Sequence, residues 1–240
     1  MIKYMNLVGR KARKAFEQKI DTKIKNRVLN KYAELLGNEK KLILKQNLKD
    51  ANYARKIGIK NNLISRLLIN ETKLKDIQNS IFKIAKLKDP VGNTLEKWKR
   101  PNGLNISKIS IPIGVIGVIY ESRPNVTSDV ASLCFKSGNP VILKGGSEAI
   151  NTNRILAKIF RKALKVNQVD ENFIQFIDTK HRRVVDIMLS DMKKYIDVII
   201  PRGGKNLVKR VQDLSSVPII GHLEGLCHTY VDKDATLTMA

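Results

Sequence analysis

The chain of 240 residues lacks the features that would place it in or across a membrane. It contains no run of about 18 apolar residues, which excludes an ordinary membrane-spanning helix. Its N-terminal sequence MIKYMNLVGRKARKAF carries charges throughout, and a secretory signal would need an apolar segment there. We therefore expect a cytoplasmic protein with no membrane partner.

Cysteine is scarce as well. Cys134 and Cys227 are the two cysteines, each among apolar or small residues and without CxxC spacing. A disulfide framework or a metal site needs more cysteines at closer spacing. We expect reduced thiols and no metal.

Acidic and aromatic residues are few: 45 Lys and Arg face 22 Asp and Glu, and the chain has one Trp and six Tyr. A net charge of +23 is also found in nucleic-acid-binding proteins. Here the basic residues are spread along the whole chain, and no set of aromatic residues indicates base stacking. We expect a solvated lysine surface and no nucleic-acid partner. The alternative predicts retention on DNA or RNA that weakens steeply with salt.

The first third of the chain has a helical pattern. Apolar residues recur at four-residue spacing at Ile20, Ile24, Val28 and Tyr32, and this pattern continues to about residue 88. Proline and glycine then interrupt it at 89–92 and again at 100–103. We expect a helical region at 1–103 and a second domain at 104–240.

Short β-branched runs alternate with helical stretches after residue 103. The runs, which predict buried strands, are 109–120, 141–144, 173–177, 198–200 and 217–220. The helical stretches are 127–137, 148–165, 181–194 and 204–213. This alternation predicts an α/β fold with a Rossmann-like parallel sheet, in which ligands gather at the carboxyl ends of the strands.

The loop after the first long strand, residues 121–127, is dense in polar groups. Arg123 offers a fork of donors suited to a carboxylate or a phosphate, and Asn125 can present an N–H to a developing oxyanion. A capped turn shaped by Pro124 is the plainer interpretation.

The loop at 144–149 follows another apolar strand. Lys144 can reach a ribose or a phosphate, and Gly145 and Gly146 allow a cofactor to approach the backbone. Ser147 is a candidate N-cap, and Glu148 suits the positive end of a helix dipole. An ordinary capped connection explains the same residues equally well.

A third loop, residues 201–205, closes a strand on Gly203 and Gly204 and resembles an anion nest. Neither GxGxxG nor GxxxxGK[ST] occurs in the chain. The residues alone therefore indicate an α/β nucleotide-binding candidate.

These loops and their flanks resemble glutamate-5-semialdehyde dehydrogenase, also called gamma-glutamyl phosphate reductase, a branch of the aldehyde dehydrogenase superfamily. The matching segments are DPVG and RPNGL at 89–104, IPIGVIGVIYESRPNVT at 111–127, LCFKSGNPVILKGGSE at 133–148, IIPRGG at 199–204 and HLEGLCHTYVD at 222–232. YESRPNVT and LCxKSGN are specific to this branch. The resemblance implies the cofactor domain of an aldehyde dehydrogenase, preceded by a helical region.

The activity that the resemblance implies is NADPH-dependent reduction of L-glutamate 5-phosphate to L-glutamate 5-semialdehyde and phosphate. This is the second step of proline biosynthesis from glutamate. In the family a cysteine thiolate displaces phosphate, and hydride then reduces the thioester.

The resemblance also implies roles for single residues. Asn125 matches the asparagine that stabilises the oxyanion, and Lys144 matches the lysine beside the adenosine ribose. Gly146, Ser147 and Glu148 adjoin that lysine, and Gly203 and Gly204 match a loop near the cofactor. A lysine at the ribose favours the extra phosphate of NADP over NAD.

Residues that face the substrate are expected at Arg123, His222 and Glu224. His222 aligns where hydrolytic relatives keep a glutamate that activates water, and an acyl-phosphate reductase must avoid hydrolysing its thioester. The absence of a carboxylate there suits the expected reaction.

The family's nucleophilic cysteine follows the HLEGLCHTYVD segment by several tens of residues, so we expect the chain to end before it, at Ala240. Cys134 and Cys227 are expected to be structural thiols. The 240 residues alone should then lack reductase activity. A non-catalytic nucleotide-binding or oligomerising remnant is the alternative, and self-association stays open.

Overall fold

Five helices form the first part of the protein in a computed structural model that describes residues 1–121, 123–221, 228–236 and 238. The helices are α1 (Ile2–Phe16), α2 (Thr22–Asn38), α3 (Lys40–Lys56), α4 (Asn61–Leu67) and α5 (Glu71–Lys86). The helical pattern expected up to about residue 88 is therefore confirmed. No helix in the described part of the chain is long and apolar enough to cross a bilayer.

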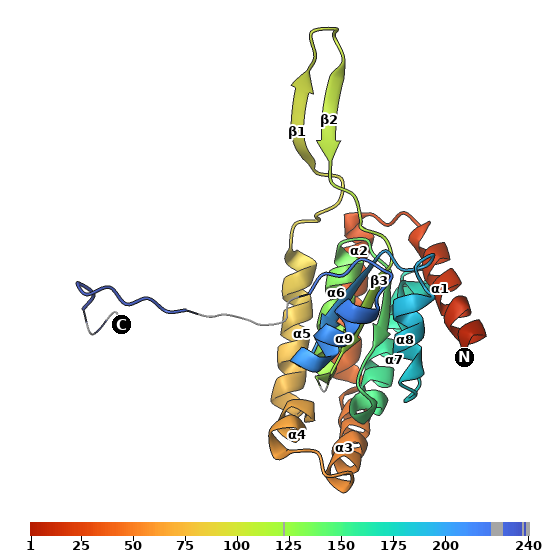
Figure 1. Cartoon of the computed structure of the whole chain (residues 1–240), viewed down its shortest axis with the longest axis vertical. Helices are drawn as coiled ribbons and strands as arrows, with labels where there is room; N and C mark the ends of the chain where they lie inside the picture. The colour runs from red at the N-terminus through yellow and green to blue at the C-terminus, as the bar shows by residue number, and fades with distance from the viewer. Residues whose placement is uncertain (122, 222–227, 237, 239–240) are drawn as a thin grey trace.

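A two-stranded antiparallel hairpin follows, formed by β1 (Thr94–Lys99) and β2 (Asn105–Ile109). It projects from the body of the molecule (Figure 1), and all but one of its strand residues are exposed. The expected division between residues 103 and 104 falls in its turn, and that division stays a prediction.

The expected single strand from Ile109 to Tyr120 is a wrong prediction. Ile109 ends the exposed hairpin, and the buried strand begins only at Ile116. The backbone between them breaks the ladder, because Pro112 has no N–H to donate and Gly114 takes a φ of +129°.

A four-stranded parallel sheet forms the second part of the molecule. Its strands β3 (Ile116–Tyr120), β4 (Val141–Lys144), β5 (Ile174–Phe176) and β6 (Val198–Arg202) lie in the order β5-β4-β3-β6. The connecting helices are α6 (Pro124–Lys136), α7 (Ile150–Val166) and α8 (Arg183–Ser190), and α9 (Lys205–Leu214) follows β6. Single turns of 3-10 helix, η1 (Ser147–Ala149) and η2 (Glu171–Phe173), precede α7 and β5. The Rossmann-like sheet is confirmed.

The expected last strand at 217–220 is reduced to one isolated bridge between Ile219 and Ile199. That prediction is wrong in extent, because an apolar run shows only that a segment is buried and not how many ladder bonds it makes.

Helices cover both faces of the sheet, as the two-residue period of its strands requires. Val118 and Tyr120 face a core built with α2, α5, α6 and α7, in which the rings of Tyr32 and Phe160 stack with centroids 4.3 Å apart. Ile119 faces the opposite core, built with α1, α8 and α9. The sheet is thus fixed from both sides.

A buried ion pair anchors the base of the hairpin. The ammonium group of Lys25, whose side chain is 3% exposed, lies 2.9 Å from the carboxylate of Asp89. The hydroxyl of Thr22 and the backbone N–H of Val91 also donate to Asp89. Burial alone would raise the pKa of Asp89, but the hydrogen bonds from Val91, Lys25 and Thr22 outweigh it and hold that pKa below its usual value.

Replacing Asp89→Asn should lower the free energy of unfolding by about 3 kcal/mol, because it leaves Lys25 buried without a counter-charge. Since the folded-state pKa of Asp89 is lowered, its contribution is present above the unfolded-state pKa and is lost as the pH falls through the folded-state value. Urea denaturation between pH 7 and pH 3 measures both effects.

The exposed pair of Lys31 and Glu34 supplies the control. Glu34→Gln should change stability by less than about 0.5 kcal/mol. Equal effects of the two substitutions would contradict the role given to the buried pair.

Candidate functional site

The sheet has a topological switch at β3. The chain passes from β3 to β4 and β5 on one side and then returns to place β6 on the other. In register, Ile119 of β3 lies beside Lys144, and Tyr120 lies beside Arg202. The three loops singled out from the sequence therefore lie together at the carboxyl ends of the parallel strands, where open α/β sheets bind ligands.

The loops after β3 and β6 are joined through Glu121. Its backbone N–H donates to the carbonyl of Arg202 at 3.2 Å, and its carboxylate accepts from the N–H of Gly204 at 2.8 Å. A side chain on Gly203 would collide with that carboxylate. The N-terminus of α9, expected to hold an anion, thus binds a carboxylate of the protein itself.

Lys144, Gly146 and Glu148 lie together at the end of β4. Lys144 is 7% exposed, and its ammonium donates to the carbonyl of Gly145 at 2.6 Å. Burial lowers the pKa of Lys144, and the charge of Glu148 opposes this effect. The space beside the Gly146 backbone is filled by the Glu148 carboxylate. Lys144 is therefore a buried cation at the strand end.

Ser147 is not the N-cap expected from the sequence. Ser147 is the first residue of the 3-10 turn η1. The N-cap residue of α7 is Ala149, which makes no side-chain capping hydrogen bond. The carboxylate of Asp50, on α3, accepts from the backbone N–H groups of Asn151 (3.2 Å) and Thr152 (2.7 Å) instead. A residue about 100 positions away caps α7, so the local sequence gives no signal for it.

A buried hydrogen-bond chain supports these loops from below. Tyr120 of β3 bonds Thr127 of α6 with 2.6 Å between their oxygens, and Thr127 donates to the Asn153 side-chain oxygen on α7 at 2.9 Å. The Asn153 amide nitrogen is buried without a partner among the described residues. A side chain on Gly145 would meet that amide and the Tyr120 ring. Only glycine fits there.

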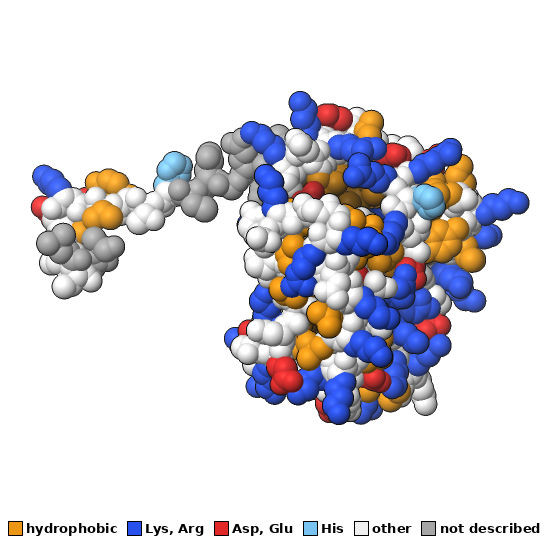
Figure 2. Space-filling model, turned by 90° about the horizontal axis from the view of Figure 1, so that it is seen from below, with side chains coloured by type: hydrophobic (Ala, Val, Ile, Leu, Met, Phe, Trp, Pro, Cys, Tyr) orange, Lys and Arg blue, Asp and Glu red, His pale blue; other side chains and the backbone are white. Residues whose placement is uncertain are grey.

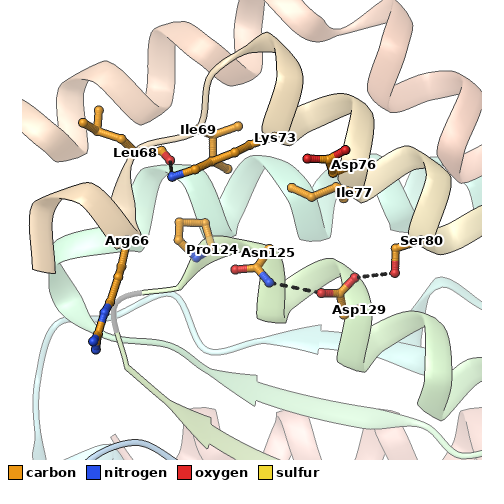
Figure 3. A pocket seen from close by; sticks show the side chains of 10 residues that line it. All are labelled: Arg66, Leu68, Ile69, Lys73, Asp76, Ile77, Ser80, Pro124, Asn125 and Asp129. Atoms are coloured by element: carbon orange, nitrogen blue, oxygen red, sulfur yellow. Dashed lines mark hydrogen bonds between the residues drawn. The ribbon is translucent and has the colours of Figure 1, made fainter. Parts of the chain in front are cut away.

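Asn125 lies in the first turn of α6, beside a cavity of about 380 Å³ between that helix and α4 and α5. Its amide nitrogen donates to Asp129 at 3.1 Å, and Ser80 donates to the other carboxylate oxygen at 3.2 Å (Figure 3). Burial raises the pKa of Asp129, while the hydrogen bonds from Asn125 and Ser80 lower it. The amide of Asn125 is thus oriented by a half-buried carboxylate.

The expected substrate residues are only partly described. Arg123 is exposed at the N-cap position of α6. His222 and Glu224 lie outside the described residues, as does Cys227. Among the described residues, no group of His, Cys, Asp and Glu could hold a metal.

A reductase from Clostridium tetani, named gamma-glutamyl phosphate reductase, is 45% identical to this chain over 240 residues, which cover 99% of the chain and 56% of the relative. The crystal structure of gamma-glutamyl phosphate reductase from Thermotoga maritima matches with a TM-score of 0.87 and 37% identity, over 90% of this chain and 52% of that one. No family model matches.

The chain is similar to gamma-glutamyl phosphate reductases along nearly its whole length. It spans just over half the length of the relatives it matches. An acetylating aldehyde dehydrogenase from Geobacillus thermoglucosidasius has the same fold, with a TM-score of 0.70 at 17% identity over 91% of this chain and 45% of that one.

Of the two cysteines in the chain, Cys134 lies in the core, 6% exposed. Burial raises the pKa of its thiol to about 12. A thiol of that pKa is almost wholly protonated at neutral pH, and the thiolate is the nucleophilic form. Cys134 is thus a structural thiol, as its position among apolar residues indicated.

Asp129, which lines the cavity beside Asn125, was missed by sequence reasoning. Its signal is a spacing of four from Asn125, which places both residues on one face of α6. Asp129 therefore belongs with Asn125 in one unit.

The close packing beneath the loops predicts that Gly145→Ala will destabilise the chain by about 1–3 kcal/mol, because the added carbon would collide with the buried side chains of Tyr120 and Asn153. Gly204→Ala is the control, since an added carbon there lies 3.8 Å from its nearest neighbour. Its cost at a helix N-cap should stay below about 1 kcal/mol. Urea denaturation compares the two, and a Gly145 variant as stable as the control would contradict the packing argument.

Proposed function

We propose that the chain is the cofactor-binding part of an enzyme that reduces L-glutamate 5-phosphate with NADPH, giving L-glutamate 5-semialdehyde and phosphate. The observation that carries this proposal is the sequence identity of 45% along the chain, with the YESRPNVT segment at the switch point of the sheet. The reaction makes the chain part of proline biosynthesis.

The residues at the strand ends fit a dinucleotide. Lys144 has one hydrogen-bond partner among the described residues, the carbonyl of Gly145, so its other N–H bonds suit a ribose hydroxyl and an adjacent phosphate. Gly203 and Gly204 lie beside the Glu121 carboxylate, which accepts from the N–H of Gly204 and can accept a further hydrogen bond from a cofactor hydroxyl. NADPH, when bound, supplies the hydride for the reduction.

Asn125 is proposed as the oxyanion donor. A carboxamide nitrogen carries two protons, and one of them is directed to Asp129. The other is available for the oxygen that becomes negative when a thiolate attacks the acyl phosphate. Donors fixed in this way before reaction stabilise the transition state without reorganising.

The thiolate itself is proposed to come from a residue other than Cys134, whose thiol is buried and protonated. Cys227 is also proposed not to be the nucleophile, so a polypeptide of these 240 residues should bind NADPH through the strand-end loops and show no turnover. Fluorescence titration measures the binding, and absorbance at the nicotinamide band measures turnover with freshly generated glutamyl phosphate. Failure to bind NADPH would count against the function, and turnover would refute the proposed lack of activity.

The cofactor preference is proposed to depend on Lys144. Lys144→Met should weaken NADPH binding about tenfold, or about 1.4 kcal/mol, and NADH binding less, because only NADPH carries the extra phosphate. Lys97→Met on the exposed hairpin removes the same charge far from the strand ends and should leave both affinities unchanged. An equal loss for both cofactors would exclude a role for Lys144 in the choice.

A non-catalytic nucleotide-binding or oligomerising module is the second candidate. The hairpin favours it, because Leu95 and Trp98 are 58% and 43% exposed on β1, whose outer edge pairs with no other strand among the described residues. Such a module would bind NADPH in the same titration, so binding does not separate the two candidates. The gene sequence does, because the gene of a non-catalytic module would encode no nucleophilic cysteine after residue 240.

We propose a cytoplasmic protein, with Arg123, His222 and Glu224 facing the substrate. Figure 2 shows Lys and Arg side chains scattered among neutral and hydrophobic atoms rather than gathered in one stripe. This pattern supports the solvated surface over a nucleic-acid partner.

A further inference from the structure

The cavity beside Asn125 has room for more than the reacting group. Its volume of about 380 Å³ is at the lower end of the range for small-molecule sites. Apolar side chains from three elements line it, including Leu68, Ile77 and Pro124. Such a lining suits the methylene groups of a short aliphatic chain.

One wall of the cavity is negative. The carboxylate of Asp129 is half-buried and forms no ion pair within the described part of the chain. Its two oxygens accept from Asn125 and Ser80, and each can accept a further hydrogen bond. Asp76, one turn before Ser80 on α5, adds a second carboxylate (Figure 3). A buried carboxylate without a cation is costly, and a ligand ammonium would relieve that cost.

The opposite side of the cavity is positive. The ammonium of Lys73 is fixed by the carbonyls of Ser65 and Leu68, both at 2.8 Å, and keeps a third proton to donate. Arg66 also lines the cavity. Opposite charges on two sides of a small cavity match a group that carries an ammonium and a carboxylate on one carbon.

The spacing agrees with the proposed substrate. The amide nitrogen of Asn125 and the nearer carboxylate oxygen of Asp129 are 3.1 Å apart, and a hydrogen bond of about 3 Å from each can reach two ligand groups roughly 5 Å apart. In extended glutamate, four bonds of about 1.5 Å separate the amino nitrogen from the side-chain carbonyl carbon, which spans about 5 Å. A ligand of this length can place its carbonyl at Asn125 and its ammonium at Asp129.

We propose that this cavity binds the α-amino-acid end of the substrate, with the ammonium group on Asp129 and the carboxylate directed to Lys73 and Arg66. The assignment of the carbonyl to Asn125 rests on the proposed function. The match between the charged groups of the ligand and the two charged sides of the cavity does not depend on the proposed function.

The test is a titration of the 240-residue chain with each of three ligands. The affinities are measured from nuclear magnetic resonance signals of its isotope-labelled amides. L-Glutamate carries both charged groups, glutarate lacks the ammonium, and 4-aminobutyrate lacks the α-carboxylate. The unaltered chain should bind L-glutamate at least tenfold more tightly than glutarate. Equal affinities would overturn the proposal, even if every variant failed to fold.

Variants separate the two walls. Asp129→Asn should weaken L-glutamate and 4-aminobutyrate about tenfold and leave glutarate unchanged, while Arg66→Gln should weaken L-glutamate and glutarate but not 4-aminobutyrate. Asp213→Asn removes the same charge on the exposed face of α9 and should change nothing. A loss that is the same for all three ligands, or for Asp129 and Asp213, would overturn the assignment.

NADPH titration of the same samples distinguishes this inference from the proposed function. Retained NADPH binding without any preference for L-glutamate sinks the cavity assignment alone. Preference for L-glutamate without NADPH binding supports the cavity and counts against the reductase.

Discussion

Burial of β3 on both faces constrains the whole molecule. All five of its residues are buried, and at Gly117 the packing with Met188 and Ile199 leaves only about 3.1–3.2 Å for an added carbon. A strand buried on both faces does not accommodate charged side chains, so the charged residues of the site lie after its end at Tyr120. The candidate site residues therefore lie at the carboxyl ends of β3, β4 and β6, in the loops that follow these strands.

The sequence predicted the parts of this arrangement that depend on local patterns. Four-residue periodicity located the first helices, and β-branched runs located the strands at 141–144, 173–177 and 198–200. Lys144 was noticed because it ends an apolar run, and Asn125 because it lies in the polar loop after one. Periodicity is a property of neighbouring residues, so it can be read without a structure.

The features that sequence reasoning missed depend on contacts between distant residues. Asp50 on α3 caps α7, and Asp129 on α6 accepts a hydrogen bond from Ser80 on α5. The exposed hairpin was merged with β3 because Ile109 has the composition of a buried strand. Composition reports which residues tolerate burial, and only packing decides which are buried.

Helix α1 has a consequence for the order of folding. Met5 and Val8 pack in a core with α8, and Arg13 lies 2.7 Å from Asp197. At about 5–20 residues per second, a ribosome takes roughly 10–40 s to make the residues between them. During that time α1 has been made, while the residues of α8 and Asp197 that contact it have not. Complete packing of α1 therefore has to wait for residues that are synthesised long after it.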